Sequence, residues 1–96
     1  GQLTFERPDT ETFRGLALAY QAMRRGGNIP TAFNAANEKA VALFLDRKIA
    51  YQQIPEMIES CMEAASFIAS PTVDEILETE AAAYEHIAGK WGKVFV

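Results

Sequence analysis

The sequence predicts an all-α protein, a small four-helix bundle preceded by a short extended segment. Apolar residues recur at spacings of three and four along most of the chain, which is typical of amphipathic helices. Gly and Pro residues separate these periodic segments. Only the opening residues and the connector at 49–51 resemble a strand. With 96 residues, the chain is expected to form a single helical domain, 1–96, with a core of its own.

The opening residues 1–9 are expected to act as an extended linker or tether, because Pro8 disfavours helical backbone at the residue before it. The first helix is expected over residues 13–25. Gly26 and Gly27 should end it, since glycine readily adopts the positive φ of a helix C-terminus. The predicted inward stripe of this helix is Phe13, Leu16, Ala19, Tyr20 and Met23.

The second helix is expected over residues 29–48 and the third over residues 52–69. Pro55 fits only in a first turn, so the third helix should begin near Gln53 or Ile54. The predicted inward stripe of the second helix is Phe33, Ala36, Ala40, Val41 and Phe44. The predicted stripe of the third is Ile54, Met57, Ile58, Cys61, Met62 and Ala65.

The fourth helix is expected within residues 70–91, where Thr72 and Glu75 have the spacing of a capping box. The pattern breaks at Gly89, so residues 89–96 are expected to form an irregular apolar tail that needs a surface to cover. The predicted inward residues are Val73, Ile76, Leu77, Tyr84, Ile87 and Ala88. The apolar residues of the tail are Trp91, Phe95 and Val96, with Trp91 and Phe95 as a hypothetical contact between two copies.

Charge and composition argue against several classes of partner. The formal net charge of −4 disfavours a surface for nucleic acid. No apolar run approaches the about 20 residues that a membrane-spanning helix needs, so we expect no membrane partner. The single cysteine, Cys61, excludes an internal disulfide and fits a reducing compartment. Its place in an apolar stripe favours a small core residue over a nucleophile.

The motifs of catalytic and metal sites are absent from the sequence. The stretch RRGGNIP lacks the GxGxxG spacing of a nucleotide site, and no HExxH or CxxC occurs. His86 is expected to cap a helix or lie at the surface, and Ser60 has no base near it in the sequence. The acidic series, expected to form a solvated helix face, is Asp74, Glu75, Glu78, Glu80 and Glu85. We therefore predict no catalytic, cofactor-binding or metal-binding residue in this chain.

One polar cluster remains, in the stretch NAANEKAV at residues 34–41. Asn34, Asn37 and Glu38 share one face of a helix because they are spaced i, i+3 and i+4. Two amides and a carboxylate can make several hydrogen bonds, and each buried polar group left unpaired costs about 1–3 kcal/mol. Three interpretations are open: a structural polar seam that fixes an irregular segment, an inter-domain contact, or chemistry. Chemistry is the weakest of these, because no histidine, metal motif or nucleophile lies beside the cluster.

Three segments taken in order resemble a known family. They are LTFERPD at 3–9, the segment at 16–54 that contains NAANEKAV, and PTVDEILETE at 71–80. The most specific element is the combination of LTFExPD with NAANExAVxxFLxxKI at this separation. Over residues 3–84 the chain is similar to the C-terminal domain of 1-deoxy-D-xylulose 5-phosphate reductoisomerase.

The resemblance implies that the chain is a fragment of a longer enzyme. Members of the family convert 1-deoxy-D-xylulose 5-phosphate to 2-C-methyl-D-erythritol 4-phosphate with NADPH and a divalent cation, Mg or Mn. They act as homodimers in the non-mevalonate route to isoprenoids, in the bacterial cytoplasm. Their catalytic, cofactor and metal residues belong to other domains, so the fragment should be inactive alone and hold no cofactor. Its expected partner is the catalytic domain of its own chain; the alternative is a free-standing helical interaction module.

Overall fold

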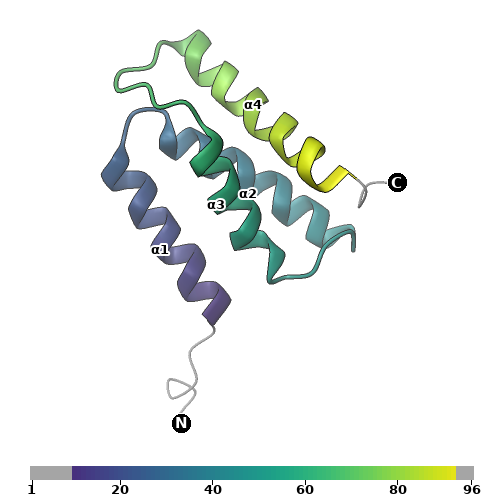
Figure 1. Cartoon of the computed structure of the whole chain (residues 1–96). Coiled ribbons are helices and arrows are strands. Elements are labelled where there is room, and N and C mark those ends of the chain that lie inside the picture. Colours follow the sequence, from purple (N-terminus) through teal and green to yellow (C-terminus); the bar gives the residue numbers. More distant parts are fainter. Residues whose placement is uncertain (1–9, 93–96) are drawn as a thin grey trace.

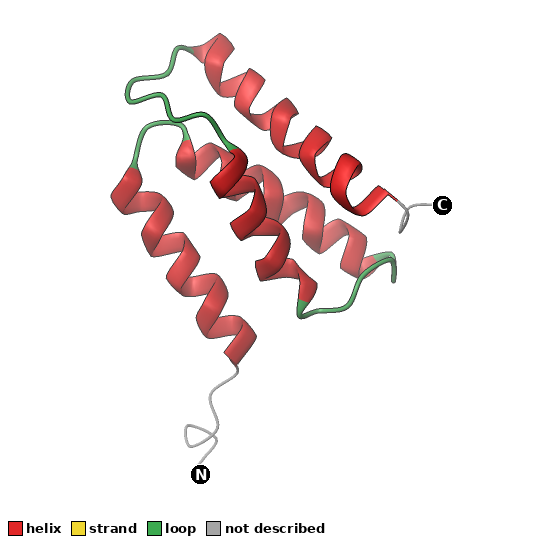
Figure 2. Cartoon of the chain, in the orientation of Figure 1, coloured by secondary structure: helices red, strands yellow, loops and turns green. Residues whose placement is uncertain are grey.

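Four helices follow one another along the described part of the chain (Figure 1). The computed structural model describes residues 10–92, and side chains from residue 13 onward. The helices are α1 (Thr10–Arg25), α2 (Ile29–Leu45), α3 (Gln53–Ala64) and α4 (Val73–Trp91). Figure 2 shows only helices and loops within these described residues. The prediction of an all-α, four-helix architecture is confirmed, whereas the expected tether at 1–9 lies outside the described residues.

The α2–α3 pair forms the centre of the bundle, with α1 on one side and α4 on the other (Figure 1). Both outer helices contact α2 and α3, but within the described residues they do not contact each other. The domain is therefore flat, with an extent of 17 Å along its shortest axis. As a consequence, each outer helix is covered on one side only.

Local signals place several helix ends where the sequence predicts them, although α2 ends at Leu45 and α3 ends at Ala64, before the expected residues 48 and 69. Gly26 and Gly27 end α1 with φ values of 68° and 59°. Pro55 lies in the first turn of α3, which begins at Gln53 as expected. Thr72 and Glu75 form the predicted capping box of α4. The Glu75 N–H donates to Thr72 Oγ1 at 3.1 Å, and the Thr72 N–H donates to Glu75 Oε1 at 2.9 Å.

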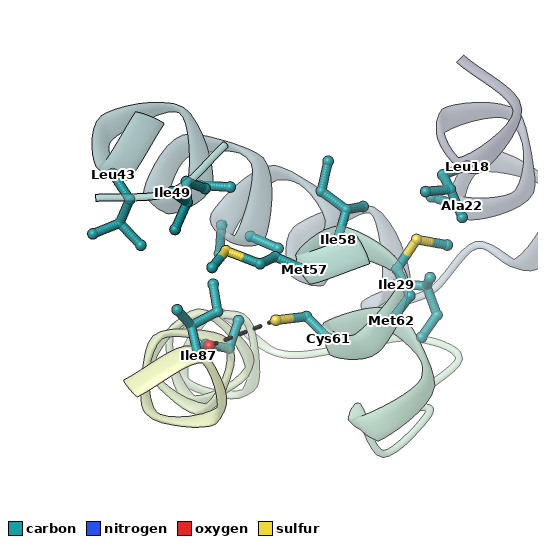
Figure 3. Packing of buried hydrophobic residues seen from close by; sticks show 14 residues of the cluster. Leu18, Ala22, Ile29, Leu43, Ile49, Met57, Ile58, Cys61, Met62 and Ile87 are labelled. Atoms are coloured by element: carbon teal, nitrogen blue, oxygen red, sulfur yellow. Dashed lines mark hydrogen bonds between the residues drawn. The ribbon is translucent and has the colours of Figure 1, made fainter. Parts of the chain in front are cut away.

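The core is built mainly by α2 and α3 (Figure 3). The stripe predicted for the third helix is confirmed at its centre, where the buried residues are Met57, Ile58, Cys61 and Met62. The stripe of the second helix is confirmed in part: Ala36 and Ala40 are fully buried, whereas Phe33, Val41 and Phe44 are half-buried. Alanines at the centre of α2 allow the backbones of neighbouring helices to approach closely.

The inward stripe predicted for the first helix is wrong. Its large residues, Phe13, Leu16, Tyr20 and Met23, are all exposed. Instead α1 buries Leu18 and Ala22, and these two lie one turn apart on the opposite side of the helix. Periodicity detected the side of α1 with four large apolar residues, whereas the side that packs against the α2–α3 pair carries Leu18 and Ala22.

The prediction for the fourth helix is also wrong in its first half. Val73, Ile76 and Leu77 are exposed, as is Ala88 near the other end, whereas Tyr84 is half-buried and Ile87 is buried. The buried series of α4 is Thr79, Ala83 and Ile87. A hydrogen bond from Asn28 to Thr79 helps to set this rotation, because it turns Thr79 toward α2.

The irregular tail predicted from residue 89 is wrong for its first part. Helix α4 continues through Gly89 to Trp91, because a helical glycine costs only about 1 kcal/mol relative to alanine. Trp91 is half-buried and packs against the core of its own domain. Phe95 and Val96 lie outside the described residues. Among the described helices none is long and apolar enough to cross a membrane.

Candidate functional site

The three residues of the predicted polar seam lie on the outer side of α2, where they face different neighbours. Glu38 is exposed, and its Oε1 accepts a hydrogen bond of 2.9 Å from the Tyr84 hydroxyl of α4. This hydrogen bond to a carboxylate raises the pKa of the Tyr84 phenol above its ordinary value. Asn34 is exposed and Asn37 is half-buried. Neither amide side chain makes a hydrogen bond to another residue of the described part of the chain.

Asn37 lies in a groove between α1, α2 and the start of α3. The residues that line this groove are Gly15, Leu16, Ala19, Phe33, Asn37, Val41, Tyr51, Ile54, Pro55 and Ile58. Almost all of them are apolar, and Asn37 supplies the amide. The sequence-predicted cluster therefore splits: Glu38 bonds α4, whereas Asn37 opens into the groove on the α1 side.

A different asparagine makes the main buried polar contact of the bundle. Asn28 is 1 % exposed, and its side chain reaches three partners. Its Nδ2 donates to Ser66 O at 2.8 Å and to Thr79 Oγ1 at 3.0 Å, and its Oδ1 accepts from the Ile68 N–H at 2.8 Å. Asn28 thus joins the α1–α2 turn, the 65–72 loop and α4.

Sequence reasoning missed Asn28 because its partners lie 38 to 51 residues away. No spacing of residues in the local sequence indicates such a contact. The available signal was weak: an amide residue placed between two glycines and Ile-Pro, in a turn too short for a solvated loop. An ordinary turn residue would give the same signal. Only the tertiary structure shows that Asn28 is a buried polar contact.

The structure also brings together Ser60 and His86, which are distant in the sequence. Ser60 Oγ lies 2.7 Å from His86 Nε2, and Lys90 Nζ donates to Ser60 Oγ at 3.3 Å. Lys90 lies over the ring of Trp91, 5.2 Å from its centroid. His86 therefore links α4 to α3, where the sequence suggested a cap or a surface position.

This Ser–His contact lacks the other parts of a nucleophilic site. Ser60 lies within α3, where backbone N–H groups are used by the helix and cannot form an oxyanion hole. Among the described residues no carboxylate bonds the His86 ring to orient it. We therefore interpret the contact as a polar link between two helices.

Cys61 is a core residue, as predicted. It is 2 % exposed, and its thiol contacts Ala83 O at 3.6 Å (Figure 3). Burial raises the pKa of the Cys61 thiol to about 11, although the positive charge of Lys90 acts in the opposite direction. The thiol is therefore protonated near neutral pH and is a poor nucleophile.

The acidic residues of α4 do not converge with other ligands. Within the described part of the chain, no group of three or more His, Cys, Asp or Glu residues could hold a metal ion. Buried side-chain N and O atoms of the described residues all have a hydrogen-bond partner. The buried polar side chains of the described domain thus form hydrogen bonds that connect helices and loops to one another.

Comparison with known proteins shows the family of this chain. A profile described as DXP reductoisomerase C-terminal domain matches residues 1–86. The chain belongs to this family. A 1-deoxy-D-xylulose 5-phosphate reductoisomerase of Agathobacter rectalis is 66 % identical over 89 residues, covering 93 % of this chain and 23 % of the relative. The corresponding enzyme of Lachnospira eligens is 57 % identical over 90 residues, covering 94 % of this chain and 24 % of the relative.

More distant reductoisomerases match the same part of the chain. That of Bacteroides thetaiotaomicron is 53 % identical over 81 residues, covering 84 % of this chain and 21 % of the relative. The matched part of this chain therefore spans 21–24 % of the length of these curated relatives. No solved structure matches the chain.

Proposed function

We propose that this domain supports the catalytic domain of a 1-deoxy-D-xylulose 5-phosphate reductoisomerase and supplies no catalytic residue itself. The parent enzyme would convert 1-deoxy-D-xylulose 5-phosphate to 2-C-methyl-D-erythritol 4-phosphate with NADPH, in the bacterial cytoplasm and as a homodimer. The support is mechanical: a rigid bundle holds the elements that in turn position a substrate pocket.

The observation that carries this proposal is the use of the polar side chains inside the bundle. Asn28 bonds the 65–72 loop and Thr79, and Ser60 bonds His86. The groups that would be candidates for chemistry thus hold helices in place. As the family resemblance implies, the proposal assigns the divalent cation and NADPH to the other domains of the parent enzyme.

Of the interpretations left open by the sequence, we propose the inter-domain contact for Asn34, Asn37 and Glu38, with the catalytic domain as the partner. The two amides have no hydrogen-bond partner among the described residues, so both can bond a neighbouring domain without losing a contact within this one. Glu38 already bonds Tyr84 and would contribute its second carboxylate oxygen.

The test is complementation. The preceding domains are produced separately, mixed with this chain, and NADPH oxidation is followed with 1-deoxy-D-xylulose 5-phosphate as substrate. We expect activity in the mixture and none from either piece alone. A matched control uses this chain with Asn28→Ala, which weakens the bundle without touching the proposed seam. Full activity of the preceding domains alone would contradict the support role.

The same experiment distinguishes the support role from the second candidate function, a free-standing interaction module. A module would fold and bind without changing the activity of the preceding domains. The family match over residues 1–86 favours the support role, because it assigns this chain to a named domain of the enzyme.

A further inference from the structure

Helix α1 has apolar side chains around nearly its whole circumference. Between residues 13 and 23 only Arg14 and Gln21 carry charged or amide side chains. One side packs on the α2–α3 pair through Leu18 and Ala22. The exposed apolar stripe on the other side is Phe13 at 57 %, Leu16 at 49 %, Tyr20 at 55 % and Met23 at 72 % exposure. A helix that is apolar all round is characteristic of an element buried from both sides.

The stripe is continuous with the groove that holds Asn37. Leu16 belongs to both, and from it the groove passes over Phe33 and Val41 of α2 to Ile54 of α3. We call the stripe and this groove together the α1 face. It offers a broad apolar surface with a side-chain amide, at Asn37, that has no hydrogen-bond partner among the described residues. Contiguous exposed apolar surface of this kind is typical of interaction sites.

A second exposed apolar surface lies at the start of α4 and differs in charge. Its apolar residues are Val73, Ile76 and Leu77. They alternate with the acidic residues Asp74, Glu75, Glu78 and Glu80. Covering this surface would remove carboxylates from water, which is costly unless each finds a partner. Residues 13–25 of α1 contain no acidic residue, so covering this part of α1 removes no carboxylate from water.

We propose that the α1 face is the surface on which the polypeptide preceding this domain in the reductoisomerase packs. The proposal rests on the support function and identifies its contact surface. The occupant presents apolar side chains to the stripe and a hydrogen-bonding group to the Asn37 amide.

The position of α1 in the chain supports this occupant. Phe13 lies in the first turn of α1, directly after the point where preceding polypeptide joins the bundle. This chain spans 23–24 % of its two relatives from Agathobacter and Lachnospira and matches a C-terminal domain, so most of those enzymes precede it. The acid-rich start of α4 lies on the far side of the α2–α3 pair (Figure 1).

The test is cysteine labelling in the full-length enzyme, with two matched pairs of positions. Tyr20→Cys is compared with Leu77→Cys, because the native side chains are 55 % and 56 % exposed in the domain. Met23→Cys is compared with Val73→Cys, both at 72 %. Maleimide labelling is followed by mass spectrometry of the individual peptides, so cysteines elsewhere do not interfere. In denaturant all four positions should label at the same rate.

In the native enzyme we expect Tyr20→Cys and Met23→Cys to label at least tenfold more slowly than their α4 partners. Equal rates within both pairs, or slower labelling on α4, would overturn the proposal. Protection of α1 that disappears when the enzyme is diluted to monomers would also overturn it, because the occupant would then be a second copy. Two pairs keep the test decisive if one variant does not fold.

Failure of the α1-face proposal is distinguishable from failure of the support function. If complementation shows that the domain is required but α1 labels as fast as α4, only the assignment of the face is wrong. If the preceding domains are fully active alone while α1 is protected, the face is correct and the support role is wrong.

Discussion

Asn28 is the residue on which the packing of the longest loop depends. Its side chain bonds the carbonyl of Ser66 and the amide of Ile68, and its own backbone N–H donates to Ile68 O at 3.0 Å. The loop therefore pairs with Asn28 through side chain and backbone together. A buried amide with all its partners in place fixes one arrangement of loop and helix.

We expect Asn28→Ala to lower the free energy of unfolding by about 3 kcal/mol, because it leaves several buried or half-buried polar groups unpaired. The matched control is Asn34→Ala, the same substitution at an exposed position, for which we expect a change within about 0.5 kcal/mol. Urea denaturation of both variants checks the prediction. Equal destabilisation would show that Asn28 is not the main polar contact.

Burial of Cys61 makes the stability of the domain depend on pH in the alkaline range. Its folded-state pKa is about 11, against an ordinary value of 9.0, because burial disfavours the thiolate. The unfolded chain therefore releases this proton first as pH rises. The contribution of the thiol to stability is complete below pH 9.0 and is lost as pH approaches about 11.

We expect the free energy of unfolding to fall more steeply with pH in this window for the native chain than for Cys61→Ala. The comparison with Cys61→Ala removes the contributions of lysine and tyrosine residues, which both proteins share. Denaturation across the alkaline range measures the two slopes. Parallel slopes would mean that the thiol is not effectively buried.

At the scale of elements, the α1–α2 turn is defined by contact with the 65–72 loop. Gly26 and Gly27 both have positive φ, so any other residue would be strained at either position. They differ in surroundings. A Cβ at Gly26 would meet open space, whereas a Cβ at Gly27 would overlap the carbonyl oxygen of Ile68.

We expect Gly26→Ala to cost about 1–2 kcal/mol through backbone strain alone. Gly27→Ala should cost clearly more, because it also forces the loop away from Asn28. Thermal denaturation of the two variants provides the measurement. Equal midpoints would indicate that the loop can move aside freely.

The ends and the inward sides of the helices differ in how far the sequence predicts them. Helix ends depend on residues close in sequence, such as the two glycines after α1 and the capping box of α4, and these predictions are confirmed. The inward side depends on the neighbours. Both outer helices carry apolar residues on more than one side, so periodicity chose the larger residues and was wrong for α1 and for the first half of α4.

At the scale of the whole molecule, the flat arrangement leaves groups without partners inside the described domain. Asn37 is half-buried in the groove and makes no hydrogen bond to a described residue. Its proposed partner belongs to the rest of the enzyme. The i, i+3, i+4 spacing could therefore suggest the residues of the candidate site, but it could not indicate their partner.

We expect Asn37→Ala to destabilise the full-length enzyme by about 1–3 kcal/mol, because a bond across the domain contact is lost. In this chain alone the same substitution should be nearly neutral. Melting temperatures of both proteins, together with turnover, test this. An unchanged melting temperature with a large fall in turnover would contradict the seam and favour direct involvement in the active site.

The sequence by itself determined the fold class, the number of helices, most of their ends and the family resemblance. These features depend on local periodicity, glycine and proline, and on residue order. Only the tertiary structure decided which side of α1 and α4 faces the core, that Asn28 is the buried polar contact, and that Ser60 meets His86. The reason is physical: these contacts join residues 26 to 51 positions apart, and their energy depends on which helices become neighbours.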